Sequence, residues 1–378
     1  VEVVDAAGAP DHLPRCDLVV DAAYGTGFRG DYDAPDPAGA PVLAVDIPSG
    51  VNGLTGEAGA GAVRAVRTVT FAALKPGLLL GRGPELAGEV AVADIGLDTS
   101  GATASVVETH DVRAWLPPIS RESHKWRTAL WVVAGSPGMT GAAHLCSRAA
   151  MRSGAGTVRL GIPGVAADPR FLEVVGRTIP ATGWADAVIE DAERAKAMVV
   201  GPGLGRMDSA RDDVRRLLER SPLPTLVDAD GLFALGAADD AAGMLGGRTA
   251  PTVLTPHDGE FTRLCGARPG PDRLGATRDL AKRLSATILL KGSTTIVAGP
   301  DGRVLFSTAG DARLATAGTG DVLSGVIGAF LAQGMDPLRA AGAGAHVHGE
   351  AGRRGWSRGL VAGDLLDAIP AVLAGLGE

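Results

Sequence analysis

The stretch AMVVGPGLGRMDSARDDVRRLLERSPLPTLVDAD, residues 197–230, decides the fold. It opens with an apolar run typical of a buried strand, continues at 208–221 with the pattern of an amphipathic helix, and ends with a second apolar run, PTLV. A strand, a helix and another strand in this order form the unit from which parallel α/β sheets are built.

The same alternation continues on both sides of this unit. GATRDLAKRLSA predicts another helix at 275–286, and further apolar runs predict strands at LWVVAG, TVRLGIP, PTVLTPH and TILLKGSTTIV. We therefore predict an α/β fold for residues 126–378, a doubly wound sheet with helices on both faces. The richness in Ala and Gly predicts close packing of these helices on the sheet.

Residues 1–108 carry a shorter set of strand-like runs: CDLVVDAAYG, VLAVDIPSG, RTVTFAAL and EVAVADIGL. Their near-continuous apolar character predicts a partial Rossmann-like α/β segment with strands buried on both faces. Ten residues separate Gly30 from Pro41, and with three acids and two prolines among them they leave no room for a crossover helix. The polar stretch 109–125, which contains Pro117-Pro118, predicts a linker between the two domains.

Charge and composition exclude several classes of protein. The 36 basic and 43 acidic side chains are interspersed, which leaves no electrostatic footprint for nucleic acid or an anionic membrane. The longest charge-free apolar stretch near the C-terminus, Val322 to Met335, is shorter than the about 20 residues that span a bilayer. We expect a cytoplasmic protein that forms homo-oligomers and whose other partners are small molecules.

The start of the chain and its cysteines give two further expectations. The chain opens at Val1, directly in a strand-like VEVVD and without a basic and apolar leader, which suggests a truncated N-terminus. Cys16, Cys146 and Cys265 form no CxxC pair and lie far apart. We predict buried thiols rather than a disulfide framework or a zinc site.

The strongest functional signal is AGTGD at 317–321, followed at once by the apolar helix VLSGVIGAFLAQG. Glycines ahead of a helix allow the N–H groups of 317–320 to converge on an anion at the positive end of the helix dipole, which predicts a phosphate site. Asp321 either complements the dipole or deprotonates a hydroxyl that attacks a bound phosphoryl group.

Two further motifs follow strands at their carboxyl ends, where open α/β sheets bind ligands. Lys291, in KGSTT, either contacts a phosphate or nucleotide or caps a hairpin turn. His257, in TPHDGEF, either donates to a ligand or to a nearby carbonyl.

Several other residues allow two interpretations each. Gly203, in GPGLG, lies in a tight turn or lets backbone approach a ligand. We interpret Asp230 as the N-cap of the following helix and leave Asp228 open between a cap and a metal-side or phosphate-side acid. Ala142 begins a helix and either packs closely or approaches a ligand. His346 and His348 do not share a helix face, and we interpret them as packing or solvent residues.

Two strand-end loops of the first segment each contain an acid, small residues and a hydroxyl. One is Tyr24–Gly30, which follows Asp21, and the other is DIPSG at 46–50. Together they fit a phosphate and a monovalent cation, although either alone would be only a turn. Lys75 is either a further candidate residue of this site or a solvated lysine.

GPGLG, TPHDGEF, KGSTT and AGTGD, in this order on one doubly wound domain, resemble the ADP/ATP-dependent NAD(P)H-hydrate dehydratases of the ribokinase-like superfamily. DAAYGTGFRG, AVDIPSGVNGLTGE and VTFAALKPGLLLGRG resemble the carboxyl-terminal part of the YjeF-type NAD(P)H-hydrate epimerase domain that bacterial repair enzymes fuse to the dehydratase. The resemblance covers nearly the whole chain. The family's Asn- and Gly-rich nucleotide loop and its helix between the GTG loop and AVDIPSG are missing, which argues against epimerase activity.

The resemblance implies nicotinamide nucleotide repair. The S epimer of NADH or NADPH hydrated at ring C6 would be dehydrated with ADP or ATP, releasing AMP (from ADP) and phosphate. Asp321 would deprotonate the C6 hydroxyl for attack on the terminal phosphate, the N–H groups of 317–320 would stabilise the transferring charge, and Mg²⁺ would accompany the nucleotide.

The resemblance also implies ligand contacts. These are Ala142, Gly203, His257 and Asp321 for the hydrate; Lys291, Gly292, Ser293, Thr294, Thr295 and Gly320 for the nucleotide; Ala317, Gly318, Thr319 and Gly320 for the anion hole; Gly25, Thr26, Gly27, Phe28, Arg29, Gly30, Asp31 and Asp46 for the epimerase-type substrate; and Asp21 and Ser49 for potassium.

Two other functions fit the same motifs. One is a small-molecule kinase of the same superfamily that acts on a vitamin-precursor alcohol, because the anion hole and Asp321 serve both reactions. The other is a non-catalytic nucleotide-binding protein. A kinase would release a stable phosphorylated product and a dehydratase would release phosphate; TPHDGEF and the epimerase-like segment favour the dehydratase.

Overall fold

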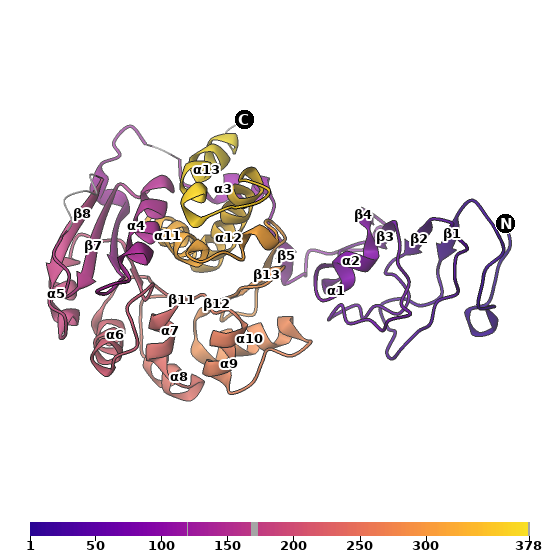
Figure 1. Ribbon diagram of the computed structural model, residues 1–378, viewed down its shortest axis with the longest axis horizontal. Helices are drawn as coiled ribbons and strands as arrows, with labels where there is room; N and C mark the ends of the chain where they lie inside the picture. The colour runs from indigo at the N-terminus through magenta and orange to yellow at the C-terminus, as the bar shows by residue number, and fades with distance from the viewer. Residues whose placement is uncertain (119, 168–172, 377–378) are drawn as a thin grey trace. The chain divides into compact units, whose positions relative to one another are not determined.

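The computed structural model describes residues 1–118, 120–167 and 173–376. It divides the chain into two compact units (Figure 1). The first unit comprises Val1–Ala102 with Gly270–Leu274, and the second comprises Thr103–Pro269 with Gly275–Glu378.

The first unit contains a four-stranded parallel sheet in the order β1-β2-β3-β4. Its elements are η1 (Ala6–Gly8), β1 (Val19–Asp21), β2 (Val42–Val45), β3 (Arg67–Phe71), α1 (Pro76–Leu79), α2 (Gly83–Ala87) and β4 (Glu89–Ala93). All four predicted strands are confirmed, and β1 connects to its parallel neighbour β2 without a helix, as predicted. The strand-like VEVVD is not a strand.

The strands of the first unit are only half-buried, so the prediction of burial on both faces is wrong for them. Exposed and covered positions alternate along β2 and β3, and Val20 of β1 is 55% exposed. Helices α1 and α2 have 4 and 5 residues, too few to cover both faces of a sheet. Their apolar side chains form a small core with Ile47 and Val51 on one face.

The second unit is built on a ten-stranded sheet in the order β5-β14-β13-β12-β11-β10-β9-β6-β7-β8. Its strands are β5 (Ala104–Val106), β6 (Ala129–Val133), β7 (Thr157–Pro163), β8 (Val174–Ile179), β9 (Ala197–Val200), β10 (Thr225–Val227), β11 (Thr252–Leu254), β12 (Thr287–Leu290), β13 (Thr295–Ala298) and β14 (Val304–Ser307). Neighbouring strands are parallel except for β12–β13 and β13–β14. The predicted strands are present, and β5, β8 and β14 are additional.

Helices cover both faces of this sheet, which confirms the predicted fold class (Figure 1). On one face lie α3 (Thr109–Trp115), α4 (Thr140–Arg152), α11 (Thr319–Ala332), α12 (Pro337–Arg354) and α13 (Ala362–Gly375). On the other lie α5 (Trp184–Asp191), α6 (Asp208–Arg220), α7 (Asp230–Leu235), α8 (Ala238–Gly246), α9 (Asp258–Cys265) and α10 (Arg273–Leu284). Short turns η2 (Lys125–Thr128) and η3 (Ala312–Leu314) complete the unit.

Small residues permit close packing of these helices. A Cβ on Gly328 of α11 would lie 2.4 Å from Cγ2 of Val199 in β9, a distance that the packed core does not tolerate. This contact bears out the packing expected from the Ala and Gly content.

The boundary between the units differs from the expected one. β5 pairs with β14 in the large sheet, so the second unit begins at Thr103 rather than after a linker. Within the segment expected to be a linker, α3 is a helix with a capping box between Glu108 and Asp111. Because the partner strand of β5 lies about 200 residues further on, local sequence gives no sign of the pairing.

Some expected core positions also differ. Cys146 is buried, Cys265 is only partly buried and Cys16 is exposed, so the prediction of buried thiols holds in full for Cys146 alone. His346 and His348 are buried, in agreement with a packing role. Across the described helices, none is long and apolar enough to cross a bilayer.

Candidate active site

The sheet of the second unit reverses its strand order at β6. The chain runs from β6 through β7 to β8 at one edge and returns as β9 on the other side of β6. Loops at the carboxyl ends of two such strands diverge and leave a crevice in which α/β proteins bind ligands. The loops that follow β6 and β9 therefore form the expected ligand site.

These two loops meet, and they bring Ala142 and Gly203 together. Gly203 has φ +64, and a Cβ on it would lie 3.0 Å from Cβ of Ala142. Ser136 Oγ donates to the Gly203 carbonyl at 2.9 Å, and the Gly135 N–H donates to the Pro202 carbonyl at 2.6 Å. Ser136 was not singled out from the sequence; its place after the β6 strand is the signal that would have found it.

Asp321 lies in the first turn of α11, three residues after the N-cap residue Gly318, which has φ +90. The first N–H groups of a helix have no intrahelical partner and point outward. Thr319 secures the turn, since its hydroxyl donates to the carbonyls of Leu314 and Thr316, each at 2.8 Å. The Thr319 N–H also donates to the Thr316 carbonyl, so it is the least available of the four predicted anion-hole donors.

Burial and the nearby carboxylate of Asp228 raise the pKa of Asp321 to about 6. A carboxylate with such a pKa is ionised at neutral pH and is a stronger base than an exposed aspartate. Behind the turn, His348 forms a hydrogen bond with the Thr319 backbone, and burial lowers the pKa of its imidazole to about 4. His348 is therefore neutral and adds no charge to the site.

Asp228, Lys291 and Ser324 form a buried ion-pair cluster next to this turn. Lys291 Nζ donates to Asp228 Oδ1 at 2.7 Å, and Ser324 Oγ donates to Asp228 Oδ2 at 2.7 Å. Burial alone would raise the pKa of Asp228, but Lys291 outweighs it and lowers that pKa. Burial would likewise lower the pKa of Lys291, and Asp228 raises it, so both groups are charged.

This cluster joins the KGSTT and AGTGD loops. A Cβ on Gly320 would lie 3.6 Å from Lys291 Nζ. The sequence left Asp228 open between a helix cap and a metal-side or phosphate-side acid. In the structure it is an acid that holds Lys291. Ser324 was not predicted as a site residue, although a hydroxyl one turn after Gly320 in an otherwise apolar helix is a signal.

His257 and Asp230 both make local hydrogen bonds. His257 is the N-cap of α9: its Nδ1 accepts from the Gly259 N–H at 2.9 Å, and Glu260 Oε2 accepts from the His257 N–H at 2.9 Å. Accepting at Nδ1 leaves the proton on Nε2. Asp230 does not cap its helix, so that interpretation is wrong; its carboxylate accepts from the Gly205 N–H at 2.9 Å and from Arg206 Nε at 2.8 Å.

In the first unit, Asp21 and Ser49 lie side by side. Ser49 Oγ donates to Asp21 Oδ1 at 2.6 Å, and the Ser49 N–H donates to Asp21 Oδ2 at 2.8 Å. The Tyr24 N–H donates to Ser49 Oγ at 2.9 Å, which ties the 24–30 loop to DIPSG. The two predicted loops are therefore brought together.

Asp46 and Lys75 form a second polar cluster of the first unit. Lys75 Nζ donates to Asp46 Oδ1, to the Phe71 carbonyl at 2.8 Å and to Thr70 Oγ1 at 3.0 Å. Burial would raise the pKa of Asp46, but Lys75 and the Phe71 N–H lower it below its usual value. Lys75 is therefore not a freely solvated lysine. Asp46 has φ +70, a left-handed conformation that is unfavourable for a residue with a side chain.

The described side chains offer no preformed metal site. Over the described ranges no group of three or more His, Cys, Asp or Glu residues is placed to hold a metal ion. Mg²⁺ in nucleotide sites is held by one or two carboxylates together with substrate phosphates and water, so it needs no such group. The negative charges of Asp228 and Asp230 reach Asp321, so this edge of the site is acidic, although Lys291 and Arg206 already engage the first two carboxylates.

The fold and the site together define an α/β protein of the ribokinase-like class. A ribokinase-like superfamily protein from Enterococcus faecalis has the same fold, with a TM-score of 0.62 at 21% identity over 74% of this chain and 99% of that one. Residues 130–371 match the family model described as NAD(P)H-hydrate dehydratase, and residues 2–77 match the YjeF-related protein N-terminus. The chain belongs to the NAD(P)H-hydrate dehydratase family and carries a YjeF-type domain ahead of it.

Individual relatives agree with this assignment. The bifunctional NAD(P)H-hydrate repair enzyme of Salinibacter ruber is 43% identical over 99% of this chain and 74% of its own length. The corresponding enzyme of Escherichia coli is 34% identical over 94% of this chain and 72% of its own. The ADP/ATP-dependent NAD(P)H-hydrate dehydratase of Bacillus subtilis, crystallised with ATP and Mg²⁺, matches 72% of this chain and 98% of its own at 30% identity and a TM-score of 0.61.

Proposed function

We propose that the second unit dehydrates the S epimer of C6-hydrated NADH or NADPH, using ADP or ATP as the phosphoryl donor and releasing AMP, when ADP is used, and phosphate. The observation that carries this proposal is Asp321, a partly buried carboxylate with a pKa of about 6 in the first turn of α11. Beside it, Gly320 supplies a backbone N–H group and Lys291 supplies a positive charge. The two lie next to each other and so could bind one phosphate.

In the first step, Asp321 takes the proton of the C6 hydroxyl. The hydroxyl oxygen attacks the terminal phosphorus of the nucleotide, and the bond from that phosphorus to the bridging oxygen breaks as the new O–P bond forms. The N–H groups at the start of α11 and the Lys291 ammonium stabilise the charge that develops on the transferring group. Mg²⁺ bound to the nucleotide would further neutralise its phosphates.

In the second step, the lone pair of the ring nitrogen expels phosphate from C6. A proton then leaves C5, and the dihydronicotinamide ring is restored. Phosphorylation is what makes this step accessible, because phosphate leaves more readily than hydroxide at neutral pH.

Ala142, Gly203 and His257 are the proposed contacts of the hydrate. The first two lie together where the loops after β6 and β9 meet, at the reversal of strand order. The capping hydrogen bonds of His257 use its Nδ1 and not its Nε2, which lies 3.6 Å from Glu260 Oε1, and the side chain is 59% exposed. Loop 291–295 and Gly320 are the proposed nucleotide contacts.

For the first unit, residues 25–31 and Asp46 are the proposed substrate contacts, and Asp21 and Ser49 are the proposed potassium ligands. Carboxylate, hydroxyl and carbonyl oxygens are donors that suit a hard cation, and Asp21, Ser49 and Tyr24 supply all three. We expect little epimerisation from this unit, because the connection between β1 and β2 contains no helix.

Absorbance recovery at the dihydronicotinamide band tests the proposal. A mixed-epimer hydrate with ADP or ATP should recover absorbance with the wild-type chain and with Asp212→Asn, an exposed aspartate of α6, but not with Asp321→Asn, which should still bind nucleotide. A stable phosphorylated product without recovery would instead support a kinase. Recovery that stalls when one epimer is consumed would support an inactive first unit, and complete recovery would contradict that part.

A further inference from the structure

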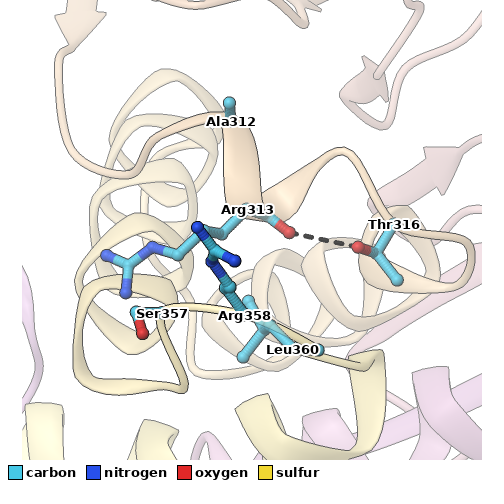
Figure 2. Close-up of a pocket in the computed structure, with 7 residues that line it drawn as sticks. Ala312, Arg313, Thr316, Ser357, Arg358 and Leu360 are labelled. Atoms are coloured by element: carbon cyan, nitrogen blue, oxygen red, sulfur yellow. Dashed lines mark hydrogen bonds between the residues drawn. The ribbon is translucent and has the colours of Figure 1, made fainter.

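A pocket of about 270 Å³ lies beside the turn at 317–321 that carries Asp321, and it takes no part in the steps proposed above. Its lining comes from η3, from Thr316 and from residues 357–360 in the loop between α12 and α13 (Figure 2). The pocket lies wholly within the second unit.

The pocket adjoins the turn that carries Asp321. Thr316 immediately precedes that turn, and its carbonyl accepts from the Thr319 hydroxyl at 2.8 Å. Ala362, two residues beyond the pocket residue Leu360, would lie 3.1 Å from a Cβ on Gly318. The pocket therefore adjoins the start of α11 on the Thr316 side.

Two arginines line the pocket, and one of them gives it a net positive charge. Arg313 is neutralised by Asp311, to which its guanidinium donates at 2.7 and 2.8 Å and whose pKa it lowers to about 2. Arg358 extends toward Arg313 in Figure 2, and in the described part of the chain no hydrogen bond or carboxylate partner holds it. One guanidinium charge at this pocket is therefore uncompensated.

The chemistry of the lining indicates an anion. A guanidinium binds phosphate oxygens through two parallel N–H groups, which makes arginine well suited to phosphate recognition. The Arg313 carbonyl accepts from the Thr316 hydroxyl at 3.1 Å, which fixes that side chain at the pocket edge, and the Ser357 hydroxyl also lines the pocket. An apolar or cationic ligand would leave Arg358 uncompensated.

We infer that this pocket, through Arg358, binds a phosphate group of the dinucleotide hydrate while its ring lies at Asp321. The inference rests on the proposed function, since a hydrated dinucleotide carries a pyrophosphate several bonds from its ring and, in the NADPH form, a further 2′-phosphate. The proposed site for the phosphates of the nucleotide donor is the Lys291 side of the turn, next to Gly320. Arg358 is thus a specificity residue for the substrate rather than for ADP.

Steady-state kinetics of Arg358→Gln test this inference, with Arg354→Gln as the matched control. Arg354 is an exposed arginine whose guanidinium lies near Gly375 and outside the pocket lining. Arg358→Gln should raise the KM for the hydrate on the order of tenfold, because a charge-assisted hydrogen bond is lost, while kcat and the KM for ADP stay unchanged. An equal rise for both hydrates would identify the pyrophosphate as the ligand, and a rise for the NADPH hydrate alone would identify the 2′-phosphate.

An unchanged KM for the hydrate, or a rise in the KM for ADP instead, would overturn the inference. Calorimetric titration with inorganic pyrophosphate, in the presence of saturating ADP, separates it from the proposed function. Binding that Arg358→Gln weakens and Arg354→Gln preserves would support the pocket even if the wild-type chain did not dehydrate the hydrate. Equal binding to all three proteins would overturn it.

Discussion

Replacing Asp321 by Asn should stabilise the second unit while it abolishes turnover. The folded-state pKa of Asp321 is about 6, raised from 3.8 by burial and by Asp228. That difference corresponds to about 3 kcal/mol by which the ionised carboxylate disfavours the folded state. The protonated acid carries no such cost, so the effect is absent below about pH 4, grows as pH rises, and is complete above about pH 6. Asparagine, which never ionises, escapes it at every pH.

Denaturant unfolding followed by tryptophan fluorescence measures this effect in the right unit. All five tryptophans lie in the second unit, with Trp131 and Trp184 fully buried, whereas both tyrosines lie in the first. Asp321→Asn should exceed the wild type by about 3 kcal/mol at pH 8 and by close to nothing near pH 4. Asp212→Asn, at an exposed site, should show no comparable change. A gain that does not vary with pH, or a loss at pH 8, would refute the electrostatic argument.

Four other changes follow from the same contacts. The kcat/KM of the wild type should fall as pH falls through about 6, because Asp321 must be ionised to accept the hydroxyl proton; a profile flat from pH 5 to 8 would exclude it as the base. Lys291→Met should destabilise the second unit by about 3–5 kcal/mol in denaturant unfolding, because Asp228, 1% exposed, loses its counter-charge. Gly320→Ala should leave stability nearly unchanged, since its Cβ would stand 3.6 Å from Lys291 Nζ, but should raise the KM for ADP by covering that ammonium. Lys75→Met should lower the stability of the first unit by about 1–3 kcal/mol, read from tyrosine fluorescence, because Asp46 loses a charged donor.

The sequence predicted the strands that are apolar throughout and failed where a strand depends on a distant partner. TVRLGIP is apolar enough to predict β7 at its observed bounds, 157–163. β5 has three residues in a polar context and becomes a strand only by pairing with β14. The burial of the first unit's strands was overestimated. An apolar run shows that a strand can be buried on both faces, but it does not show whether helices cover those faces.

The candidate site shows the same division. Local pattern located Asp321, because a glycine turn before an apolar helix is a short-range signal. The Asp228–Lys291 pair depends on β10, β11 and β12 lying next to one another, since the two residues are 63 positions apart. The contact between Ala142 and Gly203 depends on the reversal of strand order at β6, which no single segment specifies.

The two aspartates beside Lys291 illustrate how one site assigns different work to the same side chain. Asp228 is bound by Lys291 and Ser324, so its pKa is lowered and it remains an anion that fixes the ammonium in place. Asp321 shares the burial but not the hydrogen bonds, and the charge of Asp228 raises its pKa further. Neighbouring carboxylates whose pKa values are driven apart in this way take separate roles in catalysis. Asp228 thus contributes twice: it holds Lys291, the proposed phosphate contact, and its negative charge raises the pKa of Asp321.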